Sequence, residues 1–428
     1  MKVLPVRLRS LVVAFVAGLV ALSLGTSSVN AAGTAGGEWV ENSLGLELSS
    51  AILIDADTGQ VVYEVNADEP RPPASMTKMM TEYIVLEQIK SKALNWDEMI
   101  TVSEEAANTP KDGSQVYLAQ GEQYKVKDLY MAMAVGSAND ATIALASAIG
   151  GSEQGFVEKM NETAQKLGLS SAHYTSATGL ADTTVISARD QAKLAQIIIK
   201  NDPDFLEYAS TTEYKFRPRD DKPIVNINWM LASNKSNTYL KAFAYDGVDG
   251  MKTGYISAAG YTFTGTVKRG DQRYISVVMN TKSKEARFNE TAKLYNYAFN
   301  SLEKKTVIPA KSVVEKAESV KIKKGVKKSV PIITESDISL IVKKGTEPKV
   351  ELTGYELKKP EELVAPIKAG QVVGKATYKY TDEQGKALEK TVNLIASKDV
   401  KKASWFALMF RGIGGFFSGL FNGIVDLF

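Results

Sequence analysis

The chain has 428 residues, of which 44% are hydrophobic and 24% are charged, a composition of folded domains that excludes a wholly disordered or collagen-like protein. Its 52 basic and 49 acidic residues leave a net charge of +3, so no strong basic field favours nucleic acid as a partner. The chain has no cysteine and a single histidine, His173, which excludes thiolate chemistry and disfavours a Ser-His-Asp triad or a histidine-rich metal site. We therefore expect neither a metal nor another cofactor.

Residues 1–31 have the three parts of a secretory signal peptide. Lys2, Arg7 and Arg9 form a basic start, which Leu11–Leu24 follow as an apolar core and Val29-Asn30-Ala31 as a small-residue cleavage site. An uncleaved anchor is the alternative, but fourteen apolar residues are short for a membrane span of about 20 residues. We expect cleavage and export to the outer face of the bacterial cytoplasmic membrane.

Residues 36–303 mix strand-like and helical patterns and are predicted to form one domain. In chain order, the pattern predicts strands at Ala51–Ile54 and Val61–Val65, helices at Met76–Gln88 and Leu129–Val135, strands at Tyr261–Val267 and Tyr274–Asn280, and a helix from Phe288 to Leu302. The second of these helices is apolar on all sides, which indicates burial. Because strands occur at both ends of the region, we expect a sheet whose two halves meet late in the chain.

The composition changes after about residue 304. Residues 304–402 hold 22 lysines, no arginine and 13 acidic residues. Short alternating runs at Ser339–Val342, Val350–Leu352 and Ala376–Tyr380 predict strands. We therefore predict a small β-rich domain over residues 304–397. Its lysines either form a solvated surface or approach anionic lipid or wall polymer.

Residues 398–428 are predicted to form an amphipathic membrane anchor. From Trp405 to Phe428, large apolar residues recur at spacings of three and four, which gathers them on one side of a helix. Arg411 and Asp426 make a full membrane span awkward, and five glycines disfavour a helix in water. A helix lying in the plane of the membrane surface fits this pattern better than a span, and a helix packed on the protein core is the alternative.

Ser75-Met76-Thr77-Lys78 opens the predicted helix that follows Pro72-Pro73. A serine and a lysine three residues apart share a helix face, and the hydroxyl lies near the helix N-terminus, where the dipole favours negative charge. A lysine that is desolvated or close to another cation can lose its proton near neutral pH and act as a base. The pair could therefore activate a serine without histidine. The signal is weak alone, because Ser301 and Lys304 have the same spacing.

Two further triplets could bind substrate. Ser137-Ala138-Asn139 follows the buried helix and offers a hydroxyl for proton relay and an amide for a peptide carbonyl, with a helix cap as the alternative. Lys252-Thr253-Gly254 is expected just before the strand Tyr261–Val267. Its ammonium and hydroxyl could hold a carboxylate, its glycine would leave room for substrate, and Tyr255 would offer a backbone N–H. A solvated strand end is the alternative for this triplet.

The three motifs occur in a fixed order, at intervals of 62 and 115 residues. In that order the chain resembles the serine-type D-alanyl-D-alanine carboxypeptidases, or low-molecular-mass penicillin-binding proteins. Other segments that resemble this family are Asn161–Leu169, His173-Tyr174, Thr178-Gly179-Leu180, Ser187–Asp190 and Gly247–Met251. The resemblance implies an α/β (α+β) catalytic domain of the serine DD-peptidase and β-lactamase type, with an antiparallel sheet flanked by helices, then a small all-β domain and a C-terminal amphipathic helix.

The resemblance also implies a role for each motif residue. Ser75 would be the acyl-enzyme nucleophile, Lys78 its proton acceptor, and Ser137 the group that passes a proton to the leaving D-alanine. Asn139 would bind the substrate's side-chain amide. Lys252 and Thr253 would hold the terminal carboxylate, with Gly254 beside them. Backbone N–H groups of Ser75 and Tyr255 would form the oxyanion hole.

The partners that the resemblance implies are a peptidoglycan stem peptide ending in D-Ala-D-Ala, β-lactams as covalent inhibitors, and the membrane surface through the C-terminal helix. A peptidoglycan DD-endopeptidase would share every motif and stays open. A β-lactamase of the same scaffold would need a carboxylate that activates water, and no Glu-x-x-x-Asn segment lies between Ser137 and Lys252. A non-catalytic wall-binding protein is the third alternative, although it would have no need for all three motifs.

Overall fold

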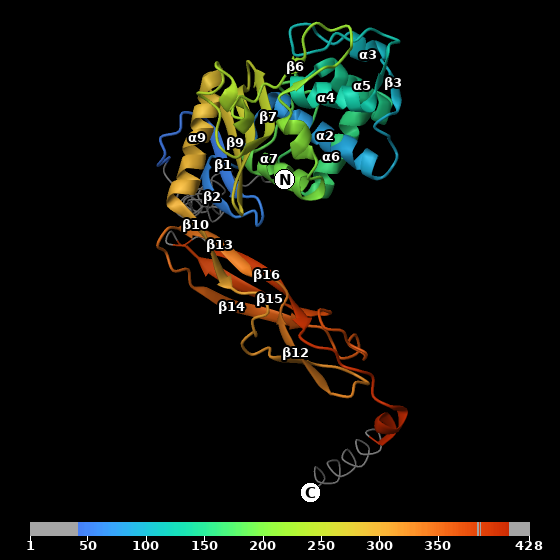
Figure 1. The fold of residues 1–428 in the computed structure, drawn as a ribbon, viewed down its shortest axis with the longest axis vertical. Helices are drawn as coiled ribbons and strands as arrows, with labels where there is room; N and C mark the ends of the chain where they lie inside the picture. Colours follow the sequence, from blue (N-terminus) through green and yellow to red (C-terminus); the bar gives the residue numbers. More distant parts are fainter. Residues whose placement is uncertain (1–41, 383–384, 386, 411–428) are drawn as a thin grey trace, which may run out of the picture. The chain divides into compact units, whose positions relative to one another are not determined.

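The computed structural model describes residues 42–382, 385 and 387–410 (Figure 1). The predicted signal peptide and most of the predicted anchor, from Arg411 onward, lie outside the described residues. In the part of the chain that the structure describes, no helix has the length and hydropathy that a membrane crossing requires.

A five-stranded antiparallel sheet, in the order β2-β1-β9-β8-β7, forms the centre of the first domain. Its strands are β1 (Ser50–Asp55), β2 (Val61–Val65), β7 (Val248–Ile256), β8 (Gly260–Arg269) and β9 (Gln272–Thr281). Because β1 pairs with β9, the sheet joins the start of the domain to its end. This confirms the prediction that the halves of the sheet meet late in the chain.

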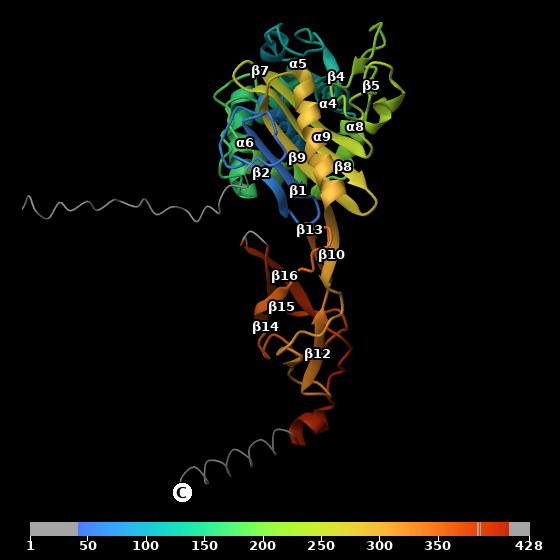
Figure 2. The same cartoon turned by 90° about the vertical axis from the view of Figure 1, so that its left-hand side faces the viewer.

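Both faces of the sheet are covered by helices (Figures 1 and 2). Side chains alternate along a strand, and in β1 Ile52 and Ile54 belong to the core shared with the helical part of the domain. Ala51 and Leu53 instead join the core under α9 (Lys284–Ser301), which packs on β8 and β9. The strand is therefore apolar at successive positions because it is buried on both sides.

The helical part of the domain surrounds α2 (Lys78–Lys90), in which every residue from Lys78 to Leu86 is buried. A short 3₁₀ turn, η1 (Ala74–Thr77), leads into this helix. The other helices of the domain are α3 (Glu104–Ala107), α4 (Val126–Gly136), α5 (Asn139–Gly150), α6 (Glu153–Leu167), α7 (Ala188–Asn201), α8 (Phe205–Ser210) and the 3₁₀ turn η2 (Ala232–Ser236). Two small two-stranded antiparallel sheets pair β3 (Met99–Thr101) with β4 (Gln123–Lys125) and β5 (Glu213–Tyr214) with β6 (Ile224–Val225).

The structure contains one strand of this sheet that was not predicted. The Lys-Thr-Gly triplet precedes β8, as expected, but it lies inside this additional strand, β7, and pairs residue by residue with β8. The segment VDGMKTGYI contains two glycines and a buried lysine, so it lacks the apolar alternation that indicates a strand. The last predicted helix begins four residues earlier than expected, at Lys284, and ends one residue earlier, at Ser301, because Leu302 already begins the next strand.

The C-terminal domain is built from strands only, as predicted. A five-stranded antiparallel sheet has the order β11-β12-β16-β15-β14, and β10 pairs with β13. The strands are β10 (Leu302–Ile308), β11 (Ser319–Lys321), β12 (Ser329–Thr334), β13 (Ile338–Lys343), β14 (Val350–Leu357), β15 (Val372–Thr381) and β16 (Ala387–Ala396). The β-strand predictions at 339–342, 350–352 and 376–380 all fall inside these elements.

The chain continues to pack on this domain beyond residue 397. Val400 is buried in the core of the C-terminal domain and pairs with Ile367, and Ala403 is also buried. Residues 405–410 then form a short helical segment. Trp405, Phe406 and Phe410 expose about two thirds of their surface there.

Candidate active site

Ser75 lies in η1, one turn before the start of α2. The preceding residue, Ala74, has a φ of 51°, an uncommon backbone conformation for a residue with a side chain. Its carbonyl packs so tightly on Gly179 that a Cβ at Gly179 would lie 1.9 Å from the Ala74 oxygen. Backbone strain of this kind concentrates at functional sites, and here it lies directly before Ser75.

The Lys78 ammonium group has three partners within hydrogen-bond distance. Nζ lies 3.0 Å from Ser75 Oγ, 2.7 Å from Asn139 Oδ1 and 2.9 Å from the Thr178 carbonyl oxygen. The amide and carbonyl oxygens can only accept, so they occupy two N–H bonds of Nζ. In a neutral amine the remaining lone pair faces the Ser75 hydroxyl, which is the geometry that a general base requires.

The surroundings of Lys78 favour this neutral amine. The side chain is fully buried, and burial followed by the positive charge of Lys252 lowers the pKa of Lys78 well below its usual value. Among the carboxylates, Glu82 opposes this shift most, and Glu153 and Asp140 oppose it less. The pKa of the lysine is therefore shifted in the direction that lets it accept the serine proton.

Ser137 and Asn139 lie at the junction of α4 and α5. Ser137 ends α4 in the left-handed conformation, with φ 59° and ψ 29°, and its buried Oγ has no hydrogen-bond partner among the described residues. Asn139 begins α5 and directs its amide oxygen to Lys78. Ser137 is the C-cap residue of α4, where its main-chain N–H donates to the Ala132 carbonyl, but neither side chain caps a helix in the structure. The unpartnered hydroxyl remains available to a bound substrate.

Lys252, Thr253 and Gly254 lie on β7, which is an edge strand of the sheet and packs against η1. The side chains of Lys252 and Thr253 are buried, at 4% and 5% exposure. Burial lowers the pKa of Lys252 to about 8, against the attraction of Glu82. Glycine at position 254 also makes room for the serine turn, because a Cβ there would lie 2.6 Å from the Pro73 oxygen and 3.0 Å from the Ser75 nitrogen.

Tyr255 follows the triplet on the same strand, and its side chain is half exposed. Its ring stacks on Tyr261 with centroids 4.3 Å apart. Arg287 lies over the Tyr261 ring and donates a hydrogen bond of 3.2 Å to the Gly254 carbonyl. These contacts fix the main chain at the end of β7, next to Ser75.

Sequence reasoning missed the loop that supports Asn139. The main-chain N–H of Asn139 donates to the Ser114 carbonyl of this loop at 2.7 Å, and a Cβ at Gly113 would lie 2.5 Å from Asn139 Nδ2. The buried Asp140 carboxylate accepts hydrogen bonds from the main chain of Val116 and Leu118. No local pattern marks this loop, because its contacts are tertiary.

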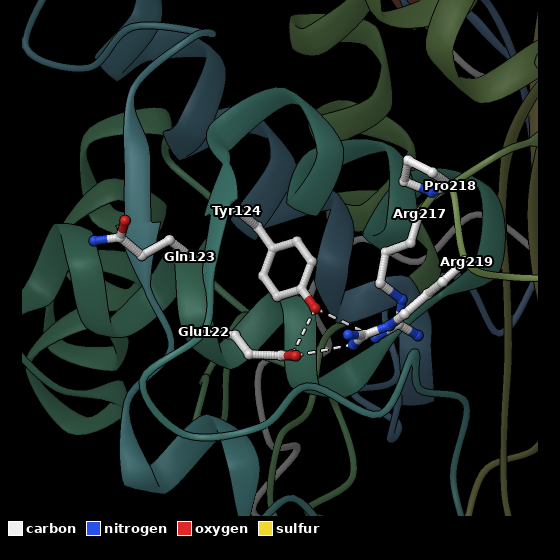
Figure 3. Close-up of a pocket in the computed structure, with 6 residues that line it drawn as sticks. All are labelled: Glu122, Gln123, Tyr124, Arg217, Pro218 and Arg219. Atoms are coloured by element: carbon white, nitrogen blue, oxygen red, sulfur yellow. Dashed lines mark hydrogen bonds and ion pairs between the residues drawn. The ribbon is translucent and has the colours of Figure 1, made fainter.

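The far end of the same loop contacts a residue of a surface pocket. This pocket is lined by Glu122, Gln123, Tyr124, Arg217, Pro218 and Arg219 (Figure 3). Arg217 donates to the Val116 carbonyl at 2.6 Å and pairs with Asp220. Arg219 pairs with Glu122, whose carboxylate also accepts from the Tyr124 hydroxyl. Each charged side chain of this pocket therefore has an ion-pair partner, and Arg217 links the pocket to the loop through the Val116 carbonyl.

Two other groups near the site were not predicted. Thr178, within a segment noted only for its resemblance, supplies the carbonyl that holds Lys78. Glu82 is buried on α2 one turn beyond Lys78. The spacing of 75, 78 and 82 on one helix face could have indicated Glu82 from the sequence. His173 is exposed, and its main chain pairs with Val185.

Comparisons with known proteins agree with this geometry. A protein-family model described as D-alanyl-D-alanine carboxypeptidase matches residues 40–283, and one described as penicillin-binding protein 5, C-terminal domain, matches residues 302–402. The chain is 34% identical to D-alanyl-D-alanine carboxypeptidase DacF of Bacillus subtilis, over 86% of this chain and 90% of DacF.

Two solved structures are also similar. Penicillin-binding protein 5 from Haemophilus influenzae is 31% identical, with a TM-score of 0.67 over 83% of this chain and 98% of its own. Penicillin-binding protein D2 from Listeria monocytogenes, solved in an ampicillin-bound form, is 33% identical, with a TM-score of 0.52 over 60% of this chain and 99% of its own. The chain therefore belongs to the D-alanyl-D-alanine carboxypeptidase family of low-molecular-mass penicillin-binding proteins.

Proposed function

We propose that this protein is an exported serine carboxypeptidase that removes the terminal D-alanine from peptidoglycan stem pentapeptides through an acyl-enzyme on Ser75. The observation that carries the proposal is the hydrogen-bonded group of Ser75, Lys78 and Asn139, in which the lysine amine is held against the serine hydroxyl by two acceptors. Family membership supports the same activity, because the relatives are named D-alanyl-D-alanine carboxypeptidases.

The first half of the reaction forms the ester. Ser75 Oγ attacks the carbonyl carbon of the penultimate D-alanine while its proton moves to Lys78 Nζ. The carbonyl oxygen becomes an oxyanion, which backbone N–H groups of Ser75 and Tyr255 would stabilise. The C–N bond to the terminal D-alanine then breaks, and the leaving nitrogen takes a proton that originates on Lys78 and passes through the Ser137 hydroxyl.

The second half returns the enzyme to its starting state. A water molecule attacks the ester carbonyl and gives its proton to Lys78, which is neutral again after the first step. The ester C–O bond breaks, the proton returns to Ser75 Oγ, and the shortened peptide leaves with a carboxylate. No histidine is needed at any step, in agreement with the exposed position of His173.

β-Lactams fit the same site as covalent inhibitors. Opening the ring by Ser75 gives an ester, but the leaving nitrogen stays tethered to the acyl group and can obstruct the approach of water. The ampicillin-bound form of the Listeria relative supports this extension to the present chain. We expect a penicilloyl adduct that lasts minutes or longer.

We also propose that the mature protein is held at the outer face of the cytoplasmic membrane by its C-terminal tail. The described start of the tail supports this proposal. Trp405, Phe406 and Phe410 expose 65–68% of their surface, which is costly in water but favourable at a lipid interface. The basic start and apolar core of residues 1–31 support export.

A substitution of Lys252 tests whether this residue gives the enzyme its specificity for a free C-terminal carboxylate. A charge-assisted hydrogen bond contributes roughly 1.5–3 kcal/mol, so Lys252→Gln should lower kcat/KM by about one to two orders of magnitude on a peptide with a free C-terminal carboxylate. The loss should be much smaller on the same peptide amidated at its C-terminus. Lys268→Gln, an exposed position on β8, is the matched control. Equal losses on both peptides would reject carboxylate binding by Lys252.

A further inference from the structure

Glu82 is a buried acid that the reaction described above does not use. It lies on α2, four residues after Lys78 and seven after Ser75, which precedes this helix in η1, and only 1% of its surface is exposed. Its Oε1 atom has no hydrogen-bond partner among the described residues. A buried ionisable group without a hydrogen bond is costly, so its presence beneath the catalytic lysine requires an explanation.

The groups around Glu82 come from several elements. Lys78 on α2 and Lys252 on β7 both attract its negative charge. Tyr130 on α4 has a buried hydroxyl without a hydrogen-bond partner among the described residues, and burial, followed by the charge of Glu82, raises the pKa of this hydroxyl. Farther out, Arg287 on α9 acts on Lys252, and Asp140 and Glu153 on α5 and α6 act on Lys78.

The two lysines must be in opposite protonation states for the reaction. Lys78 has to be neutral to take the serine proton, whereas Lys252 has to be charged to hold a carboxylate. Each is fully buried, and burial alone favours the neutral form of both. Glu82 is the carboxylate that most favours the charged form of each lysine.

Glu82 acts on Lys78 without pairing with it. The three hydrogen bonds of Lys78 Nζ go to Ser75, Asn139 and Thr178, and no salt bridge within 4.0 Å joins Glu82 to either lysine in the described structure. A direct ion pair would draw Nζ away from the serine and hold its proton. A carboxylate at longer range stabilises charge in the site and leaves the lysine in place.

We infer that Glu82 is a positioning residue whose buried carboxylate is the shared counter-ion of Lys78 and Lys252, and that it sets the pH range in which the site can work. The inference rests on the proposed roles of these two lysines. Burial raises the pKa of Glu82 to about 7 against the pull of the lysines, so the carboxylate is available at the pH where Lys252 must stay charged.

The test compares the pH dependence of kcat/KM for D-alanine release in the wild type and in Glu82→Gln. The substitution keeps the shape of the side chain but removes its charge. Both lysines should then lose their protons at lower pH, so the acid limb and the alkaline limb of the profile should both move to lower pH by about one unit or more. On the alkaline side, a shift of one unit lowers kcat/KM at a fixed pH by about tenfold.

Glu87→Gln on the same helix is the control and should leave both limbs in place, because Glu87 lies near Lys90 and not near the two active-site lysines. A purely structural role of Glu82 would lower the melting temperature, or the height of the profile, and leave the limbs unmoved. Unmoved limbs in a folded, active Glu82→Gln protein would overturn the inference. Absence of D-alanine release from the wild type would instead count against the proposed function.

Glu82→Asp decides the matter if the glutamine variant does not fold. The shorter side chain keeps the charge but withdraws it by one methylene. Both limbs should move in the same direction as in Glu82→Gln, by a smaller amount. An aspartate variant with the wild-type profile, or with limbs that move apart, would also overturn the inference.

Discussion

At the scale of single residues, the site depends on the contacts and the protonation state of one buried lysine, Lys78. Lys78 has two acceptors that position its nitrogen and one hydroxyl that it can deprotonate. Thr178 and Asn139 are as important to this arrangement as the lysine itself, because they fix the direction of the lone pair. The same three contacts would hold an ammonium ion equally well, so burial and the charge of Lys252 decide which form is present.

The pH dependence of acylation follows from these two lysines. The acylation rate should rise with pH as Lys78 loses its proton, through an apparent pKa well below the usual value of 10.5. It should fall above about pH 8, where Lys252 loses the charge that binds the substrate carboxylate. Stopped-flow acylation by a chromogenic β-lactam over pH 5–10 measures both limbs.

The Lys78→Arg variant tests whether Lys78 acts as a proton acceptor or only as a positive charge. Arginine keeps the positive charge but cannot deprotonate at these pH values, so nearly all acylation should be lost at every pH. A folded Lys78→Arg protein that still acylates would reject the assignment of Lys78 as the base.

At the scale of secondary structure elements, the position of β7 against η1 brings the binding triplet to the serine. Gly254 allows this approach, since a Cβ there would enter the space of Pro73 and Ser75. Gly254→Ala should displace the serine turn and lower acylation by on the order of a hundredfold, because small misplacements of a nucleophile have effects of that size.

Gly354→Ala is the matched control for this prediction. Gly354 lies on β14 with open space around its Cα and an ordinary φ, so the added methyl group should leave acylation unchanged. Thermal melting of both variants separates misplacement from unfolding, as overpacking costs about 1–3 kcal/mol. Normal acylation by a folded Gly254→Ala protein would show that the close approach is not needed.

The strands β1, β2, β8 and β9 and the helices α2, α4 and α9 could be predicted because apolar residues mark each of them in the sequence. β7 could not, since its buried residues include Lys252, and Gly250 and Gly254 interrupt the apolar pattern. The role of the loop at Gly113 and Ser114 could not be predicted either, because it depends on contacts with Asn139, which lies far away in the sequence. The local sequence pattern is therefore weakest at the residues that are proposed to bind substrate and at those that support them.

At the scale of the whole molecule, the chain follows an order of catalytic domain, β domain and apolar tail. We expect a chain that ends after Ala403 to be released from membranes and to keep its soluble activity. The cut is placed there because Val400 and Ala403 still pack on the β domain. Fractionation of cells that express the two forms measures the effect, and persistent membrane association of the shortened chain would contradict the anchor.

The most direct test of the account is mass spectrometry of the purified protein after benzylpenicillin, with D-alanine release from a peptide ending in D-Ala-D-Ala measured in parallel. The wild type should release D-alanine and carry one penicilloyl group on Ser75 for minutes or longer, and Ser75→Ala should do neither while it stays folded. Rapid turnover of the penicillin without a lasting adduct would indicate a β-lactamase instead. A folded wild type with neither an adduct nor D-alanine release would contradict the account and leave a non-catalytic wall-binding protein.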